Sequence, residues 1–129
     1  MDNQLEIYTK TAIGIVCQIR FTQAVYLEEF HCKCSSRLCH YTLLNPRLAE
    51  KIALVRGASD SQLTITSAFR CQTWNEEVGG VEESFHTKGS AVDLYPDDGE
   101  VEALYNLMSL YFDVVIKYGT FVHGHLLEM

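Results

Sequence analysis

The order of helix and strand signals from residue 45 onward constrains the fold of this chain more than any other feature. The first helix signal is the clearest, because Asn45 can cap it, Pro46 suits its first turn and Gly57 suits the position just past its end. The later strand signals lie at 63–66, where the strand is half-buried, and at 91–94, 114–116 and 121–127. A short helix is expected to begin at the capping-box residues 73–76. A further helix is capped by Asp98, and its apolar face runs from Val101 to Tyr111. Helices and strands are mixed without a regular βαβ alternation, so the sequence predicts the α+β class, with an antiparallel sheet and flanking helices.

The first thirty residues give no clear assignment. Residues 12–19 are apolar and β-branched, but Gly14 weakens both a helix and a strand there. Residues 31–41 are rich in cysteine and histidine and are expected to form a loop. The chain has 129 residues without an internal repeat or a Pro/Gly-rich linker, which favours one domain over residues 1–129.

Charge and hydropathy exclude two classes of partner. Ten Lys and Arg stand against seventeen Asp and Glu, so the formal net charge is −7, and a chain this acidic approaches nucleic-acid phosphates against repulsion. No run of eighteen apolar residues exists that could span a membrane. The first residues lack the basic and apolar regions of a signal peptide, so we expect synthesis in the cytoplasm without a signal peptide. We also expect a monomer.

The cysteines favour reduced thiols over a disulfide framework. They stand at positions 17, 32, 34, 39 and 71. An odd number without a signal peptide is atypical of a disulfide-bonded secreted domain. Cys17 and Cys71 are interpreted as small core residues. Residues 32–40 hold three cysteines and a histidine that could bind a structural zinc ion, but they lack two paired ligand knuckles, and ordinary loop thiols are favoured.

Candidate chemistry is concentrated in residues 84–93 and in two late histidines. The stretch 84–93 has the pattern S-x-H-x-x-G-x-A-x-D, with His86 at the end of a loop and Asp93 on the strand that follows. His123 and His125 lie on one face of a late strand, since side chains alternate along a strand. Two histidines and one carboxylate leave a fourth position for water, which is typical of a catalytic zinc site.

Four stretches carry a family resemblance, namely residues 65–71, 74–80, 84–93 and 121–123. In their order and spacing they resemble the M15 family of zinc peptidases, which shares its fold with the hedgehog signalling domain and the D-Ala-D-Ala carboxypeptidases. Residues 29–34 also resemble an early segment of many phage and bacterial members. The resemblance covers residues 28–126, and the stretch 84–93 is its most specific part.

The resemblance implies roles for individual residues. His86, Asp93 and His123 match the zinc ligands of the family. Arg70 matches an arginine that holds a carboxylate or carbonyl of the substrate, a task that suits the two-pronged guanidinium group. Ser84 is expected to line the site near the first ligand.

The third ligand and the general base are left open by the sequence. Many relatives have Asp at the position of His125, and others use the second histidine of an H-x-H pair as the ligand. We therefore favour His123 as the ligand and His125 as the neighbouring acid/base or orienting group, although the two can exchange roles. Several relatives place an acid three residues before the third ligand, where this chain has Thr120. Other candidates for the base are Glu76, Glu77 and Glu128.

The resemblance implies a zinc-dependent peptidase that cleaves the stem peptides of peptidoglycan, as a D,D-carboxypeptidase or an endopeptidase. The short length and the missing export signal suit a phage-encoded lysin that acts on the cell wall. One alternative is a non-catalytic zinc-containing module that binds a peptide or protein, because the general base is not obvious. Another is a Cys/His-rich structural zinc domain, in which replacing Cys32 and Cys34 removes the metal and replacing His86 does not.

Overall fold

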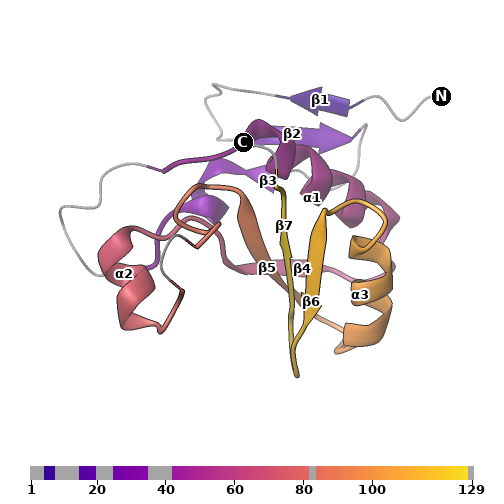
Figure 1. Cartoon of the computed structure of the whole chain (residues 1–129). Helices are drawn as coiled ribbons and strands as arrows, with labels where there is room; N and C mark the ends of the chain where they lie inside the picture. The colour runs from indigo at the N-terminus through magenta and orange to yellow at the C-terminus, as the bar shows by residue number, and fades with distance from the viewer. Residues whose placement is uncertain (1–4, 8–14, 20–24, 35–41, 82–83, 128–129) are drawn as a thin grey trace.

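Two antiparallel sheets form the framework of the computed structural model, which describes residues 5–7, 15–19, 25–34, 42–81 and 84–127 (Figure 1). The smaller sheet has the order β1 (Leu5–Ile7), β2 (Ile15–Ile19) and β3 (Val25–Tyr26), and the larger one has the order β4 (Leu63–Ser67), β5 (Ala91–Pro96), β7 (Val122–His125) and β6 (Val114–Lys117). All neighbouring strands run antiparallel. The predicted α+β class with an antiparallel sheet is confirmed, whereas the smaller sheet lies within the first thirty residues, for which no clear assignment was possible.

The described residues contain three α-helices and one short 3₁₀ helix. They are η1 (Leu27–Phe30), α1 (Pro46–Ala58), α2 (Gln72–Glu77) and α3 (Val101–Met108). The start of α1 is confirmed, because the Asn45 side chain accepts a hydrogen bond from the Arg47 N–H at 3.0 Å. Its predicted end is wrong, since the helix continues through Gly57 and is capped by Ser59. None of the helices in the described ranges is long and apolar enough to cross a bilayer.

The two later helices begin with caps other than the predicted ones. The cap of α2 is Cys71, whose sulfur accepts the Trp74 N–H at 3.4 Å, so the predicted capping-box residue Thr73 lies inside the helix. The cap position of α3 is Glu100, and Asp98 instead accepts the Glu100 N–H two residues away at 2.9 Å. At α2 the cap lies two residues earlier than predicted, whereas the side chain of Glu100 at the start of α3 makes no capping hydrogen bond.

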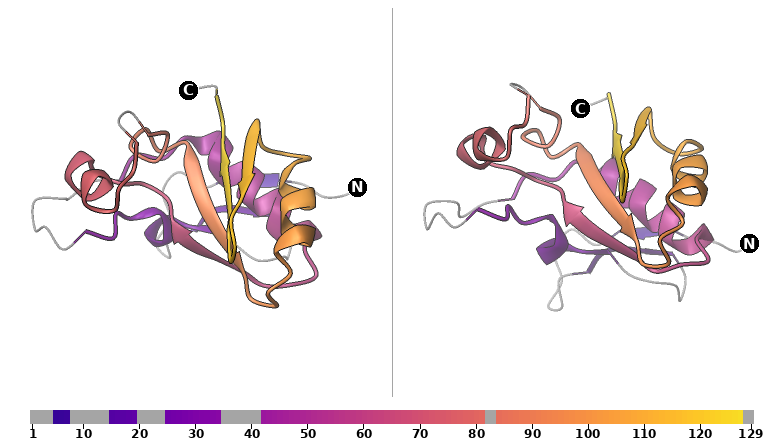
Figure 2. Two further views of the ribbon diagram at one scale, coloured as in Figure 1. Left: turned by 60° about the horizontal axis from the view of Figure 1, so that its bottom comes forward. Right: turned by 90° about the horizontal axis from the view of Figure 1, so that it is seen from below.

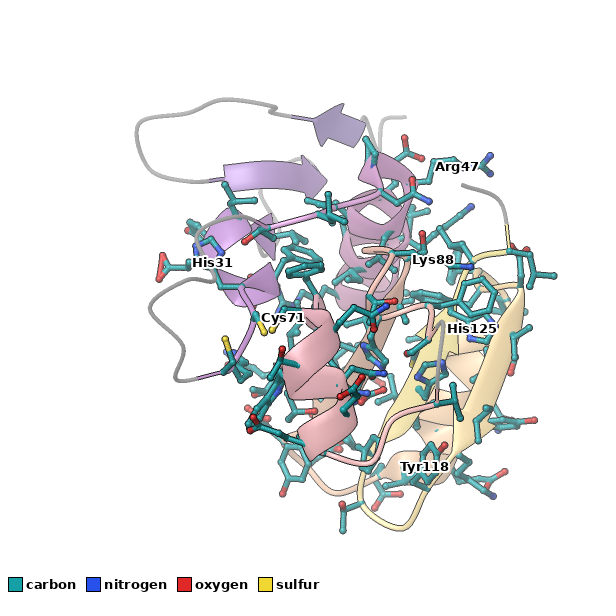
Figure 3. The ribbon with its side chains drawn as sticks, turned by 60° about the vertical axis from the view of Figure 1, so that its left-hand side comes forward. His31, Arg47, Cys71, Lys88, Tyr118 and His125 are labelled. Carbon is teal, nitrogen blue, oxygen red and sulfur yellow. The ribbon has the colours of Figure 1, made fainter. Side chains whose placement is uncertain are left out.

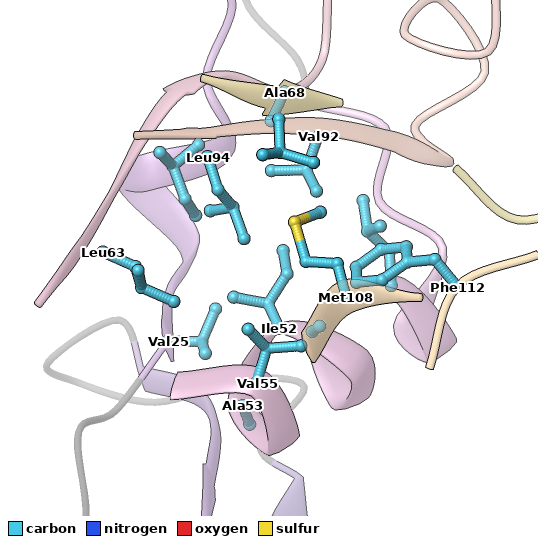
Figure 4. Packing of buried hydrophobic residues seen from close by; sticks show 14 of the residues in the cluster. Val25, Ile52, Ala53, Val55, Leu63, Ala68, Val92, Leu94, Met108 and Phe112 are labelled. Carbon is cyan, nitrogen blue, oxygen red and sulfur yellow. The ribbon is translucent and has the colours of Figure 1, made fainter. Parts of the chain in front are cut away.

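The hydrophobic core lies between α1, α3 and one face of the four-stranded sheet (Figure 4). Buried side chains from the sheet, such as Val92 and Leu94, meet Ile52 of α1 and Met108 of α3. Each such side chain contributes about 1.5–3 kcal/mol by leaving water. Figure 2 shows α2 at the end of the sheet opposite α3. Because strand side chains alternate, the residues between these core positions face the other side of the sheet.

An ion pair joins the 3₁₀ helix to α1 at the edge of this core. Arg56 makes two hydrogen bonds to the carboxylate of Glu29, at 3.0 Å from Nη1 and 2.7 Å from Nη2. Nη2 also donates to the carbonyl oxygen of Leu63 at 2.9 Å. This bidentate contact fixes the segment that leads from η1 into residues 31–34.

Candidate metal centre

Three potential metal ligands converge on the open face of the four-stranded sheet. His86, Asp93 and His123 each offer an atom within 4.8 Å of the other two. Asp93 on β5 is directly paired with His123 on β7, so both side chains leave the same face of the sheet. His86 reaches them from the turns at residues 84–90 that precede β5. The structure thus brings together the three residues that the sequence predicted as ligands.

The ring of His86 is held in one orientation. Its Nδ1 lies 2.7 Å from the carbonyl oxygen of Ala68, and because a carbonyl only accepts, Nδ1 carries the proton. The unprotonated Nε2 then faces the carboxylate of Asp93, with 3.4 Å between Nε2 and Oδ1. The Ser84 hydroxyl accepts the backbone N–H of His86 at 3.1 Å and fixes the turn. Ser84 therefore lies beside the first ligand, as expected, and its hydroxyl contacts the backbone of that ligand.

His123 presents Nδ1 to the cluster and Nε2 to its neighbour. The distance from Nδ1 to Asp93 Oδ1 is 2.9 Å, and the distance from Nε2 to His125 Nδ1 is 2.8 Å. His125 thus contacts the far side of the His123 ring. Among the described residues, the group that could hold a metal at this place includes His123 and leaves out His125. This geometry favours the first of the two ligand assignments that the sequence left open.

The charges around Asp93 keep it ionised. Burial opposes ionisation, but at the acidic pH where Asp93 titrates both histidine rings are protonated, and their hydrogen bonds and positive charge lower the pKa of Asp93 to about 2. Burial, followed by repulsion from the same two rings, lowers the pKa of His125 below its usual value. At neutral pH the site therefore offers a carboxylate, and His125 is a neutral imidazole.

The donor set fits zinc. Two imidazole nitrogens and one carboxylate oxygen are the ligands of many catalytic zinc sites. Tetrahedral ligands about 2.0–2.1 Å from the ion stand about 3.4 Å apart, which matches the distance between His86 Nε2 and Asp93 Oδ1. The Ala68 carbonyl on His86 is also the kind of partner that fixes the tautomer of a ligand histidine.

A cleft of about 400 Å³ opens above these ligands. It is lined by Arg70, Val78, Gly79, Gly80, Val81, Ser84, Phe85, His86, Asp93, Ile116, Tyr118, Phe121, His123 and His125. Two stacked pairs of aromatic rings form part of its wall. Phe85 stacks on His125 with 4.2 Å between ring centres, and Tyr118 stacks on Phe121 at 4.7 Å. Figure 3 looks onto this side of the molecule, with His125 and Tyr118 labelled. The ligands therefore lie at a surface that a chain-like substrate can reach.

Arg70 lies beside the ligands, where the sequence placed it. Its guanidinium group donates to Ser67 at 3.1 Å and to the side-chain oxygen of Asn75 at 3.2 Å, and Nη2 lies 3.5 Å from Asp93 Oδ2. Asn75 is 1% exposed, and its own amide donates to the Val81 carbonyl at 2.8 Å. Sequence reasoning missed Asn75 as a site residue, because its position in a short helix carries no signal of a contact with Arg70.

The acidic alternatives for a general base lie elsewhere. Glu76 and Glu77 are exposed on α2 and do not line the cleft, and Thr120 is also exposed and outside it. Glu128 lies outside the described residues. Among the described residues that line the cleft, Asp93 supplies the only carboxylate.

The donor set is typical of hydrolases that use a single zinc ion. A model of the Peptidase M15 family matches residues 15–125, and the chain belongs to this family. The family consists of metallopeptidases that are generally zinc-dependent, and the resemblance seen in the sequence is confirmed. A search of curated proteins found no match.

Proposed function

We propose that the chain is a zinc peptidase that cleaves the stem peptides of peptidoglycan in the cell wall. The convergence of His86, Asp93 and His123 at the cleft is the observation that carries this proposal. These residues would hold the ion through Nε2 of His86, a carboxylate oxygen of Asp93 and Nδ1 of His123. Zinc bound in this way lowers the pKa of a coordinated water to roughly 7 and polarises a carbonyl group.

Arg70 binds and orients the peptide in this proposal. Ser67 and Asn75 fix the guanidinium group from two sides, so its position at the cleft does not depend on the substrate. A guanidinium group that is already fixed loses little conformational entropy when it binds a peptide carboxylate or carbonyl. Stem peptides carry free carboxylates that the Arg70 guanidinium group can bind. This match and the family resemblance together favour stem peptides as substrates.

His125 orients the third ligand. If Nδ1 of His123 held the ion, the ring proton of His123 would lie on Nε2 and would be donated to Nδ1 of His125, which lies 2.8 Å away. The proton of neutral His125 then lies on its own Nε2, where it is a donor in the wall of the cleft. The sequence offered both an acid/base and an orienting role for His125, and this hydrogen bond supports the orienting one.

Hydrolysis by purified protein tests the proposal. Protein supplied with Zn²⁺ should release new amino groups from peptidoglycan, a chelator should stop the release, and added Zn²⁺ should restore it. His86→Ala and Asp93→Ala should abolish the activity. His31→Ala is the matched control, because His31 is exposed and lies outside the cleft. Equal release by the His86→Ala and His31→Ala proteins would refute the proposal.

A non-catalytic peptide-binding module is the second candidate. One observation favours it, namely that among the described residues lining the cleft the only carboxylate is the proposed ligand Asp93, which leaves no separate acid to serve as base. This candidate predicts that zinc bound through His86 is needed for the binding of wall peptides, and that no amino groups are released from walls of varied composition. The hydrolysis assay and a titration with soluble stem peptide distinguish the two candidates.

A further inference from the structure

A second cluster of metal-binding side chains lies away from the cleft. The sulfur atoms of Cys32, Cys34 and Cys71 all lie within 4.8 Å of one another, and the three thiols are free. In Figure 3 the sulfur atoms, drawn in yellow, gather around Cys71 beside α2. Cys71 is only partly buried, so its interpretation as a small core residue is wrong. None of the three lines the cleft that holds the histidine ligands.

The backbone brings these thiols together from distant parts of the chain. The N–H of Phe69 donates to the carbonyl of Phe30 at 3.2 Å, which aligns the two segments just before their cysteines. The N–H of Cys71 donates to the sulfur of Cys32, 39 positions away, at 3.3 Å. The Trp74 N–H donates to the sulfur of Cys71 at 3.4 Å. Peptide N–H groups directed at sulfur stabilise it as an anion, the form in which cysteine binds metals.

We propose that Cys32, Cys34 and Cys71 bind a second zinc ion, in a structural site separate from the histidine cluster. Thiolates are soft ligands that suit Zn²⁺, and at Zn–S bonds of about 2.3 Å, tetrahedral sulfur atoms stand about 3.8 Å apart. Sulfur atoms already within 4.8 Å of one another need only a small shift to reach that spacing. On binding, each thiol releases its proton to solvent and each sulfur forms one bond to the ion. All three cysteines are partly exposed, so a further donor can reach the fourth position.

This second ion would fix the position of the part of the cleft wall that contains Arg70. Cys71 directly follows Arg70 and caps α2, the helix that carries Asn75. Cys32 and Cys34 follow η1, which the ion pair between Glu29 and Arg56 anchors to α1. An ion bound by both segments would hold the backbone next to Arg70 against the segment after η1, which the ion pair already joins to α1. The cysteine site thereby supports substrate positioning without touching the substrate.

The test isolates this site by removing the other one. The full chain carrying His86→Ala and Asp93→Ala is purified under reducing conditions, loaded with Co²⁺, and its metal content and near-ultraviolet spectrum are measured. We expect one equivalent of Co²⁺ with the charge-transfer absorption of thiolate ligands, its loss when Cys32→Ser and Cys34→Ser are added, and its retention with Cys17→Ser. No bound metal in the first protein, or unchanged absorption after the two serine substitutions, overturns the proposal.

A measurement on the unaltered protein covers the case in which the serine variants fail to fold. Alkylation of each cysteine is followed by mass spectrometry with and without added Zn²⁺. The proposal expects Zn²⁺ to slow the alkylation of Cys32, Cys34 and Cys71 at least tenfold and to leave the rate at Cys17 unchanged. Equal rates with and without Zn²⁺, or a disulfide among the three, overturns it. Neither readout depends on peptidase activity, so its failure is distinct from a failure of the proposed function.

Discussion

The buried side chain of Asn75 connects Arg70 to the backbone of Val81, and both of these residues line the cleft. Its Oδ1 accepts from Arg70 Nη1 at 3.2 Å, and its Nδ2 donates to the Val81 carbonyl at 2.8 Å. Gly80 packs so closely that a Cβ at its position would lie 2.1 Å from Asn75 Oδ1. One amide therefore sets both the direction of the guanidinium group and the path of residues 78–81.

Asn75→Ala should lower the free energy of unfolding by about 1–3 kcal/mol, because it removes both hydrogen bonds of a buried amide. It should also raise KM more than it lowers kcat, since Arg70 loses one of its supports. Urea unfolding and steady-state kinetics measure the two effects. Gln72→Ala, at an exposed position of the same helix, is the control. Similar values for the two variants would show that the Asn75 contacts are not structural.

Arg70→Lys should lower kcat/KM by about tenfold to a hundredfold, the worth of a charge-assisted hydrogen bond. Lysine keeps the positive charge but loses the planar fork that Ser67 and Asn75 hold. Zinc content should be unchanged, because Arg70 supplies no ligand. Arg47→Lys, the same exchange at an exposed position of α1 outside the cleft, is the matched control. Full activity in the lysine variant would contradict a role for the fork.

Gly124 separates the two late histidines and faces the core. A Cβ there would lie 2.8 Å from Met108 Cε and 2.9 Å from Phe112 Cδ2. Gly124→Ala should therefore cost about 1–3 kcal/mol of stability through overpacking, and it should weaken zinc binding by displacing His123 on β7. Thermal unfolding and zinc titration test this against Gly119→Ala, where a Cβ meets nothing within 4 Å. A Gly124→Ala protein as stable as the control would refute the packing argument.

Local signals made part of the fold and most of the site predictable. The cap at Asn45 was predictable because it depends on residues two positions apart. The meeting of Asp93 and His123 was implied by the family resemblance, and the register of β5 and β7 provides it. His86 reaches them because a short turn joins it to β5. The cap at Asn45 and the turn at His86 use short-range geometry that a sequence displays directly, whereas the strand pairing was accessible only through the family's motifs.

Features that depend on distant pairing were not predictable. The cap of α2 is Cys71 and not Thr73, because its sulfur, an acceptor that the usual capping pattern does not include, accepts the Trp74 N–H. The contact between Cys71 and Cys32 joins segments 39 positions apart. The three-stranded sheet near the N-terminus arises from strand pairing, which single-residue propensities there did not favour over a helix.

Acid should destabilise the metal-stripped protein partly through Asp93. Its pKa of about 2 in the folded state lies below the ordinary value of 3.8, so the ionised group contributes stability above pH 4 that is lost as pH falls towards 2. The shift corresponds to about 2 kcal/mol. Urea unfolding of the metal-stripped protein and of Asp93→Asn at pH 7 and pH 3 measures it. The difference in stability between the two proteins should shrink at pH 3, and a constant difference would contradict the assignment.

The ion pair between Glu29 and Arg56 should be worth more than an ordinary surface pair. The Arg56 side chain is 6% exposed, so Glu29→Ala removes the carboxylate partner of a buried cation. We expect it to lower the free energy of unfolding by about 3 kcal/mol. This is towards the lower end for buried pairs, because Glu29 itself is 24% exposed. Glu28→Ala, one residue earlier and exposed, should cost well under 1 kcal/mol. Urea unfolding of both variants decides the matter. Equal small losses would mean that the Arg56 charge is compensated elsewhere and that η1 is held by its apolar contacts alone.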